Sequence, residues 1–180
     1  ISSAGIYAEN SNMENLGNTS EIIVNKETSV GMYAKLTSVS SVDKKAKNEG
    51  KINIKADGNG KSAGMYSKVE GSSVKLTTEN TGKMEVAQKA SAGIYAKNES
   101  SQINTQSIAT NSGLIKMNEE NSIGVTGEKS KIENSGTGNN GIEITGKKSA
   151  GILVTKESEV INTGRILLEN NSFSLSNNFW

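Results

Sequence analysis

A block of six residues returns six times along the chain, and it limits the possible folds more than any other feature. Each copy begins with serine, has glycine in third place and an apolar residue in fourth place, as in SAGIYA at Ser3–Ala8. Successive glycines lie 26 to 33 residues apart. A repeat of this length predicts a solenoid, in which each repeat forms one coil and buries its apolar side only against its neighbours. The six glycines are Gly5, Gly31, Gly64, Gly93, Gly124 and Gly151.

An Asn-x-Gly motif lies between successive copies of this block and leads into a strand with alternating apolar residues, such as Ile52 and Ile54. Asparagine tolerates the left-handed backbone conformation and glycine adopts it at no cost, so the motif predicts a tight corner. Stacked asparagine amides can also hydrogen-bond from coil to coil. We therefore interpret the asparagines as structural residues rather than ligands. They are Asn15, Asn48, Asn80, Asn111, Asn134 and Asn162.

A third, weaker strand precedes the Asn-x-Gly motif. Val39 and Val42 compete for it in the second repeat, and longer repeats insert residues between the strand and the motif, as in Thr77–Glu79 and Thr105–Thr110. Three short strands per repeat, with no amphipathic helical pattern, predict an all-β fold: a right-handed parallel β-helix of about six coils with 26 to 33 residues each. The apolar residues that mark this third strand are Met13, Val74, Leu76, Ile103, Ile132 and Val160.

The repeats cover residues 1–168, and the tail, residues 169–180, departs from them. SFSLS at Ser172–Ser176 stands where another SAGIY-like block is due, but it lacks the glycine. We interpret the tail as a degenerate coil, a cap or a boundary. Because Ile1 opens inside a repeat, we expect the chain to be a piece of a longer parent chain in which the β-helix continues.

Side chains alternate with a period of two along a strand, which divides the repeated block into two faces. In the first copy, Ala4, Ile6 and Ala8 share one face, and we expect this face to line the core in every copy. Small residues beside one larger apolar residue suit a narrow interior. The expected stack of larger residues is Ile6, Met32, Met65, Ile94, Val125 and Ile152; the small or branched residues two places before them, also expected inside, include Val30, Ala63 and Ala92.

The composition argues against several classes of function. Lys and Arg number 20 and Asp and Glu 19, and Arg165 is the one arginine, so we expect no nucleic-acid partner. The chain has no histidine and no cysteine, which removes the usual nucleophile systems and zinc ligands. We expect no enzymatic activity, no cofactor and no metal, and we interpret the acidic pair Glu119–Glu120 as solvated surface. No apolar run of about 18 residues is present, so we expect no membrane insertion of this segment.

Two columns of outward side chains, one of tyrosine and one of lysine, follow the repeated block. Stacked tyrosines can simply stabilise the surface of a sheet. Lysines stacked at about 4.8 Å repel one another, however, and a column kept for stability alone would alternate its charges. The alternative is a surface that contacts sugars or an acidic partner. Its residues are Tyr33, Tyr66, Tyr95, Lys35, Lys68 and Lys97, with Tyr7 one coil earlier.

The SAGIYA and SVGMYAK blocks, the NxGxIxI strands, and the bias to Lys, Asn and Glu without Pro or Cys resemble the passenger repeats of large fusobacterial-type autotransporter (type V) adhesins. The resemblance covers residues 1 to about 168. It implies display at the cell surface, outside the bacterial outer membrane, through a C-terminal β-barrel that is not part of this segment. It also implies a host-cell or bacterial surface receptor, or a glycan, as partner.

These observations favour a fragment of a surface-displayed adhesin passenger that mediates or supports adhesion to host or bacterial cells. Two alternatives remain. The first is a purely structural β-helical stalk or spacer with no binding site of its own. The second is a polysaccharide-processing β-helix enzyme, which the lack of histidine and the presence of only two aspartates, Asp43 and Asp57, make the least favoured.

Overall fold

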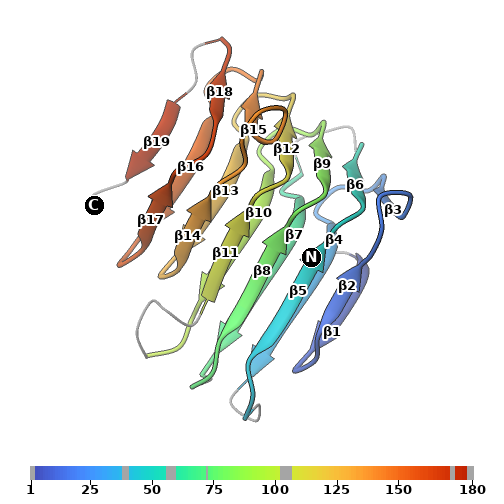
Figure 1. Cartoon of the computed structure of the whole chain (residues 1–180), viewed down its shortest axis with the longest axis vertical. Coiled ribbons are helices and arrows are strands. Elements are labelled where there is room, and N and C mark those ends of the chain that lie inside the picture. Colours follow the sequence, from blue (N-terminus) through green and yellow to red (C-terminus); the bar gives the residue numbers. More distant parts are fainter. Residues whose placement is uncertain are drawn as a thin grey trace.

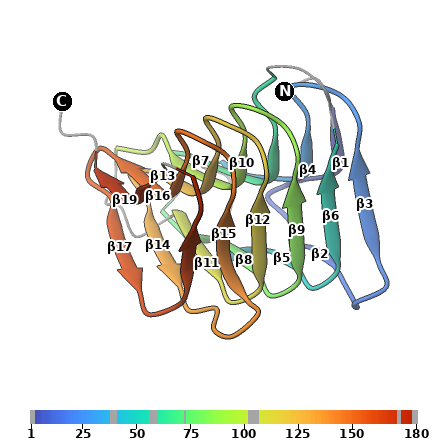
Figure 2. The ribbon, with the colours of Figure 1, turned by 90° about the horizontal axis from the view of Figure 1, so that it is seen from above.

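The computed structural model describes residues 3–37, 41–55, 60–71, 73–101, 107–170 and 173–177. These residues form β-strands joined by turns, with no helix among them. In Figures 1 and 2 the colours run from blue at one end of the stack of coils to red at the other, so the first and last described coils lie at opposite ends of a rod.

The described strands belong to three parallel sheets, and each complete coil gives one strand to each sheet (Figures 1 and 2). The first sheet contains β1 (Ala4–Glu9), β4 (Val30–Thr37), β7 (Ala63–Glu70), β10 (Ala92–Asn98), β13 (Ile123–Glu128), β16 (Ala150–Thr155) and β19 (Phe173–Asn177). The second contains β2 (Met13–Asn15), β5 (Lys44–Asn48), β8 (Leu76–Asn80), β11 (Ser107–Asn111), β14 (Lys131–Asn134) and β17 (Glu159–Asn162). The third contains β3 (Glu21–Val24), β6 (Lys51–Ile54), β9 (Lys83–Val86), β12 (Leu114–Met117), β15 (Gly141–Ile144) and β18 (Ile166–Leu168). The predicted parallel β-helix is confirmed.

The core is a narrow column of apolar side chains that runs the length of the rod. Met32, Met65, Ile94, Val125 and Ile152 are register partners in successive coils and are at most 1% exposed. Ile6 continues this stack in the first coil, where it packs against the core but is only partly buried. The predicted stack is therefore confirmed. Burying each of these side chains contributes about 2–3 kcal/mol, and the next coil supplies the cover.

The residues two places before this stack do not face the core, so that part of the prediction is wrong. Val30, Ala63 and Ala92 form a separate cluster with the tyrosine rings on the outside of the first sheet. The alternation fails at the intervening glycine. A Cβ on Gly93 would lie 2.5 Å from the core atom Ile115 Cγ2, so the empty side of this glycine points inward, as the next residue does.

A second close approach explains why Gly93 cannot carry a side chain. The same Cβ would lie 2.5 Å from the carbonyl oxygen of Gly124 in the next coil. Real Cβ atoms do not approach other atoms this closely, so the repeated glycine is required by packing on two sides. Its conformation is not the reason, because its φ is not in the left-handed region.

The asparagine ladder is confirmed. Each side-chain Nδ2 donates to Oδ1 of the asparagine in the next coil at 2.7–2.8 Å, from Asn15 to Asn162 without a break. The predicted left-handed corner is wrong, however, because none of these asparagines has a positive φ, and of the glycines of the motif only Gly17 has one. Close approach is again the cause. A Cβ on Gly113 would lie 2.1 Å from the carbonyl oxygen of Gly82.

The strands of the second sheet run directly into the Asn-x-Gly motif. Thr77–Glu79 lies inside β8 and residues 107–110 lie inside β11, so these residues are not insertions between strand and motif. The variable lengths instead occur in the connections between the three sheets. The connection from the first sheet to the second, for example, is short between β13 and β14 and longer between β4 and β5, and the connection from the second to the third is short between β5 and β6 and longer between β14 and β15. Val42 is exposed and precedes β5, whereas Val39 and Ile103 lie outside the described residues.

The tail extends the first sheet by one strand. β19 pairs in parallel with β16, with Phe173 opposite Ala150 and Leu175 opposite Ile152. Residues 173–176 of the SFSLS segment thus follow the path of the repeated block even though they lack the glycine.

Candidate functional site

The tyrosine column predicted from the sequence is a continuous ladder of rings on the outer face of the first sheet. Ring centroids of Tyr7 and Tyr33 lie 5.2 Å apart, and those of Tyr33 and Tyr66, and of Tyr66 and Tyr95, lie 5.0 Å apart. The last two pairs are stacked, with interplanar angles of 14° and 29°. Each face of the Tyr66 ring is therefore covered by a neighbouring ring, and ring edges face outward.

The rings are held as neutral phenols. Burial raises the pKa of Tyr66 to about 12. Burial also raises the pKa of Tyr95, and the Glu128 carboxylate adds to this shift because the Tyr95 hydroxyl donates to Glu128 Oε2 at 3.1 Å. Tyr95 is thereby fixed at the end of the ladder, where Thr126 takes the place of a fifth ring.

The lysine column lies beside the tyrosines as predicted, but its charges are matched. Lys68 Nζ lies 2.5 Å from Glu70 and 2.8 Å from Glu99, and Lys97 Nζ lies 2.7 Å from Glu99. Lys35 contacts Glu70 at 3.1 Å. At the two ends of the series, Glu9 pairs with Lys35 and Glu128 pairs with Lys97. Ammonium and carboxylate groups therefore alternate from coil to coil. The repulsion expected of the lysines is absent, and with it the argument that an anionic partner must neutralise them.

These ion pairs predict a loss of stability in acid. Lys68, and then Lys97, lower the pKa of Glu99 from about 4.5 to about 2, and Lys68 and Lys35 lower that of Glu70. A carboxyl group with a lowered pKa in the folded state stabilises the fold above its ordinary pKa, and this contribution disappears as the pH falls through the lowered value. We expect the melting temperature to fall between about pH 4.5 and about pH 2.

The expected effect is modest, about 0.5 kcal/mol for each of the two glutamates, because solvent screens these groups. Melting curves recorded by circular dichroism across this pH range would measure it. The Glu70→Gln/Glu99→Gln variant should show a smaller acid-dependent decrease than the unchanged chain, and added salt should reduce the difference. An identical pH dependence of the two proteins would mean that these pairs contribute nothing.

A groove runs along the rod axis beside the tyrosine ladder. Its floor is the register column Val30, Ala63, Ala92 and Ile123, one residue from each of four successive coils. Tyr66, Tyr95 and Thr126 line one side, and the corner residues Lys61, Ser62, Ala90 and Ser91 line the other. The hollow has a volume of about 410 Å³. The sequence did not predict this groove, because its floor residues were expected in the core.

The serines that open the repeated blocks form a second internal ladder, which the sequence did not predict either. Ser62 Oγ accepts from the backbone N–H of Ser29, and Ser91 Oγ accepts from that of Ser62, both at 3.2 Å. Ser149 Oγ accepts from the N–H of Ser122 at 3.0 Å. The serine that opens every SxG block could have predicted this ladder. This ladder secures the corner that forms the second side of the groove.

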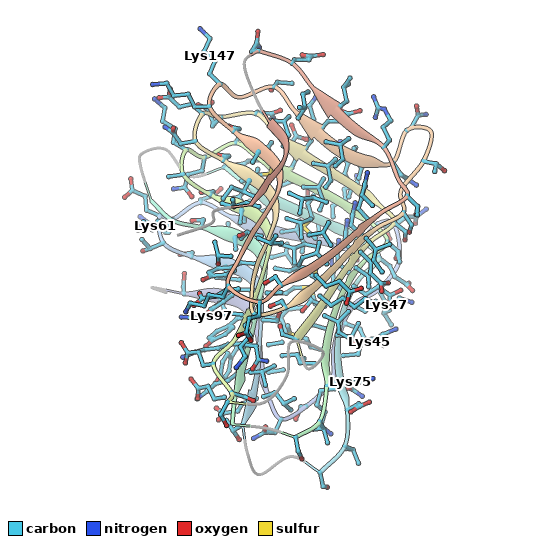
Figure 3. The ribbon with its side chains drawn as sticks, turned by 90° about the vertical axis from the view of Figure 1, so that its left-hand side faces the viewer. Lys45, Lys47, Lys61, Lys75, Lys97 and Lys147 are labelled. Atoms are coloured by element: carbon cyan, nitrogen blue, oxygen red, sulfur yellow. The ribbon has the colours of Figure 1, made fainter. Side chains whose placement is uncertain are left out.

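Elsewhere on the surface, Glu120 pairs with Lys89 at 2.7 Å. The described residues contain no group of three or more acidic side chains that could hold a metal ion. No helix in the described part of the chain is long and apolar enough to cross a membrane. Figure 3 places Lys61 and Lys97 on one side of the rod and Lys45, Lys47 and Lys75 on the other.

Comparison of the chain with protein-family models, with curated proteins and with solved structures gives no match.

Proposed function

We propose that this chain is a rod-like segment of a bacterial surface-displayed adhesin passenger, and that it supports adhesion by providing a stiff, repetitive spacer. The observation that carries the proposal is the unbroken asparagine ladder, which links every coil from Asn15 to Asn162 by side-chain hydrogen bonds. A spacer that holds a binding surface away from a cell must resist bending between its repeats.

Several other interactions act along the same axis. The serine ladder, the tyrosine stack and the alternating Lys–Glu series each connect a coil to the next. In a repeat protein each coil contacts only its neighbours, so these contacts between neighbours carry the stiffness of the whole. With about 4.8 Å of rise per coil, length is added in small and regular steps.

A second candidate function is direct contact of a surface receptor or glycan with Tyr33, Tyr66, Tyr95, Lys35, Lys68 and Lys97. The observation that favours it is the repetition of one tyrosine position in consecutive coils, which offers avidity to a partner that is itself repetitive. The paired lysines and covered ring faces count against it. Contact would have to use ring edges and hydroxyl groups.

Adhesion of chain-coated beads to bacterial and host cells would distinguish the two candidates. The spacer function predicts that the unchanged chain and the Tyr66→Ser/Tyr95→Ser variant give the same adhesion, because neither supplies the binding site. A control with equal circular dichroism and equal coating density ensures that both versions are folded. If the unchanged chain adhered well and the variant lost most of that adhesion, direct contact through the tyrosine surface would replace the spacer function.

A further inference from the structure

We propose that the groove beside the tyrosine ladder binds flat, elongated aromatic anions that lie parallel to the rod axis. This inference is independent of the spacer function, because it concerns a small-molecule site on the outer face of the first sheet. It follows from three properties of the groove: the composition and length of its floor, the orientation of its aromatic side, and the single charge at its rim.

The floor is apolar and straight. Val30, Ala63 and Ala92 are register partners that pack under the tyrosine rings, and Ile123 continues the column in the next coil. Three steps of about 4.8 Å between these four residues give a floor about 14 Å long. A groove of this shape accepts a molecule that is long in one direction and thin in another. Its volume of about 410 Å³ lies in the range of small-molecule sites.

The aromatic side of the groove favours an aromatic ligand over a sugar. Tyr66 is stacked between Tyr33 and Tyr95, so the rings turn their faces to one another and their edges outward. The edge of an aromatic ring is the positive part of its quadrupole, and it attracts the negative face of another aromatic ring. A sugar that packs on tyrosine needs a free ring face, and Tyr66 offers none.

The rim provides one cation. Lys61 is the one charged side chain that lines the groove; it is exposed and forms no ion pair with any described residue. Lys68 and Lys97, on the far side of the tyrosine column, are both paired with glutamates. A carboxylate or sulfonate at the end of an aromatic ligand would therefore meet the unpaired ammonium group of Lys61, at the corner that Lys61 and Ser62 form (Figure 3).

Two fluorescent probes of opposite charge test the proposal with the folded chain. They are anilinonaphthalene sulfonate, an aromatic anion, and thioflavin T, an aromatic cation. We expect saturable binding of the anion at one site per chain and weaker binding of the cation. Tyr95→Ser removes one of the two tyrosine rings on the aromatic side of the groove and should weaken binding of the anion by about tenfold or more. Lys61→Glu should weaken it by about fivefold and reverse the preference between the probes.

Matched controls separate the groove from the rest of the surface. Tyr7→Ser changes the opposite end of the ladder, which does not line the groove, and should leave binding unchanged. Lys75→Glu makes the same charge change on the other side of the rod and should have no effect (Figure 3). Ile123→Gln is a second test variant, for use if Tyr95→Ser fails to fold. It alters the partly exposed end of the floor without disturbing the buried core, and it should also weaken binding of the anion.

Three results would overturn the proposal. The first is no saturable binding of the sulfonate probe to the folded chain. The second is an equal loss of affinity in Tyr7→Ser and Tyr95→Ser, which would place the probe elsewhere. The third is displacement of the probe by neutral oligosaccharides, which would assign the groove to a glycan. The first two results leave the spacer function untouched, whereas the third would favour direct contact with a glycan, which the bead adhesion experiment tests separately.

Discussion

Replacing Ile94 with aspartate should destabilise the β-helix by more than about 4 kcal/mol. Ile94 is fully buried in the centre of the core stack, between Met65 and Val125 of the adjacent coils. An aspartate there would place an unpaired carboxylate among apolar side chains. Because each coil is stabilised only by its neighbours, the damage should spread to the coils on both sides. Thermal and urea unfolding followed by circular dichroism would measure the loss.

The same substitution at an outward position provides the control. Ile23 is 49% exposed in β3, so Ile23→Asp puts the charge in water and should change the free energy of unfolding by no more than about 0.5 kcal/mol. An Ile94→Asp variant with an unchanged melting temperature would contradict the inward position of this side chain.

Replacing Asn80 with alanine should cost about 2–4 kcal/mol. Asn80 Oδ1 accepts from Asn48 Nδ2, and Asn80 Nδ2 donates to Asn111 Oδ1, both at 2.8 Å. All three residues are buried. The substitution therefore removes two hydrogen bonds of the ladder and leaves the Asn111 carbonyl oxygen buried without its donor. Removing one partner of a buried hydrogen bond costs more than the bond contributes, because the remaining group stays desolvated.

The end of the ladder offers a matched comparison. Asn162 is exposed and has only one ladder bond, in which its Oδ1 accepts from Asn134 Nδ2 at 2.8 Å. Water can replace this acceptor for Asn134 Nδ2, so Asn162→Ala should cost less than about 1 kcal/mol in the free energy of unfolding measured with urea. Equal losses at Asn80 and Asn162 would show that the ladder does not act as a continuous buried network.

The sequence allowed the fold, the core stack and the asparagine ladder to be predicted. The period of the SxG block revealed the coils, and alternation from Met65 or Ile94 toward the C-terminal end of the strand revealed the inward residues. The strands of the second sheet were harder to place. Their inward residues include Ala46, Thr78 and Ala109, which are fully buried but small or polar. Small or polar residues do not produce the alternation of large apolar and polar residues that marks a strand. Thr77–Glu79 therefore resembled an insertion between the strand and the Asn-x-Gly motif.

The candidate surface was predicted only in part. Tyr66 and Tyr95 were identified because they share one position in the repeated block. The glutamates that pair with the neighbouring lysines were not identified. Glu70 and Glu99 lie at or just beyond the ends of their strands, and Glu70 meets Lys35, and Glu99 meets Lys68, only when the coils stack. Pairing between coils depends on register, and the variable connections hide that register in the sequence.

The repeat is enough to predict that the chain stacks into coils, because no single repeat can bury its own apolar residues. The side of the sheet that Ala63 and Ala92 occupy, in contrast, depends on how the coils pack. In the stacked rod, Gly93 meets the carbonyl oxygen of Gly124 and the side chain of Ile115 so closely that its inward side must be empty. This contact breaks the alternation, turns the preceding alanine outward and makes it the floor of a groove. The distance between two stacked backbones sets this outcome, and it exists only after folding.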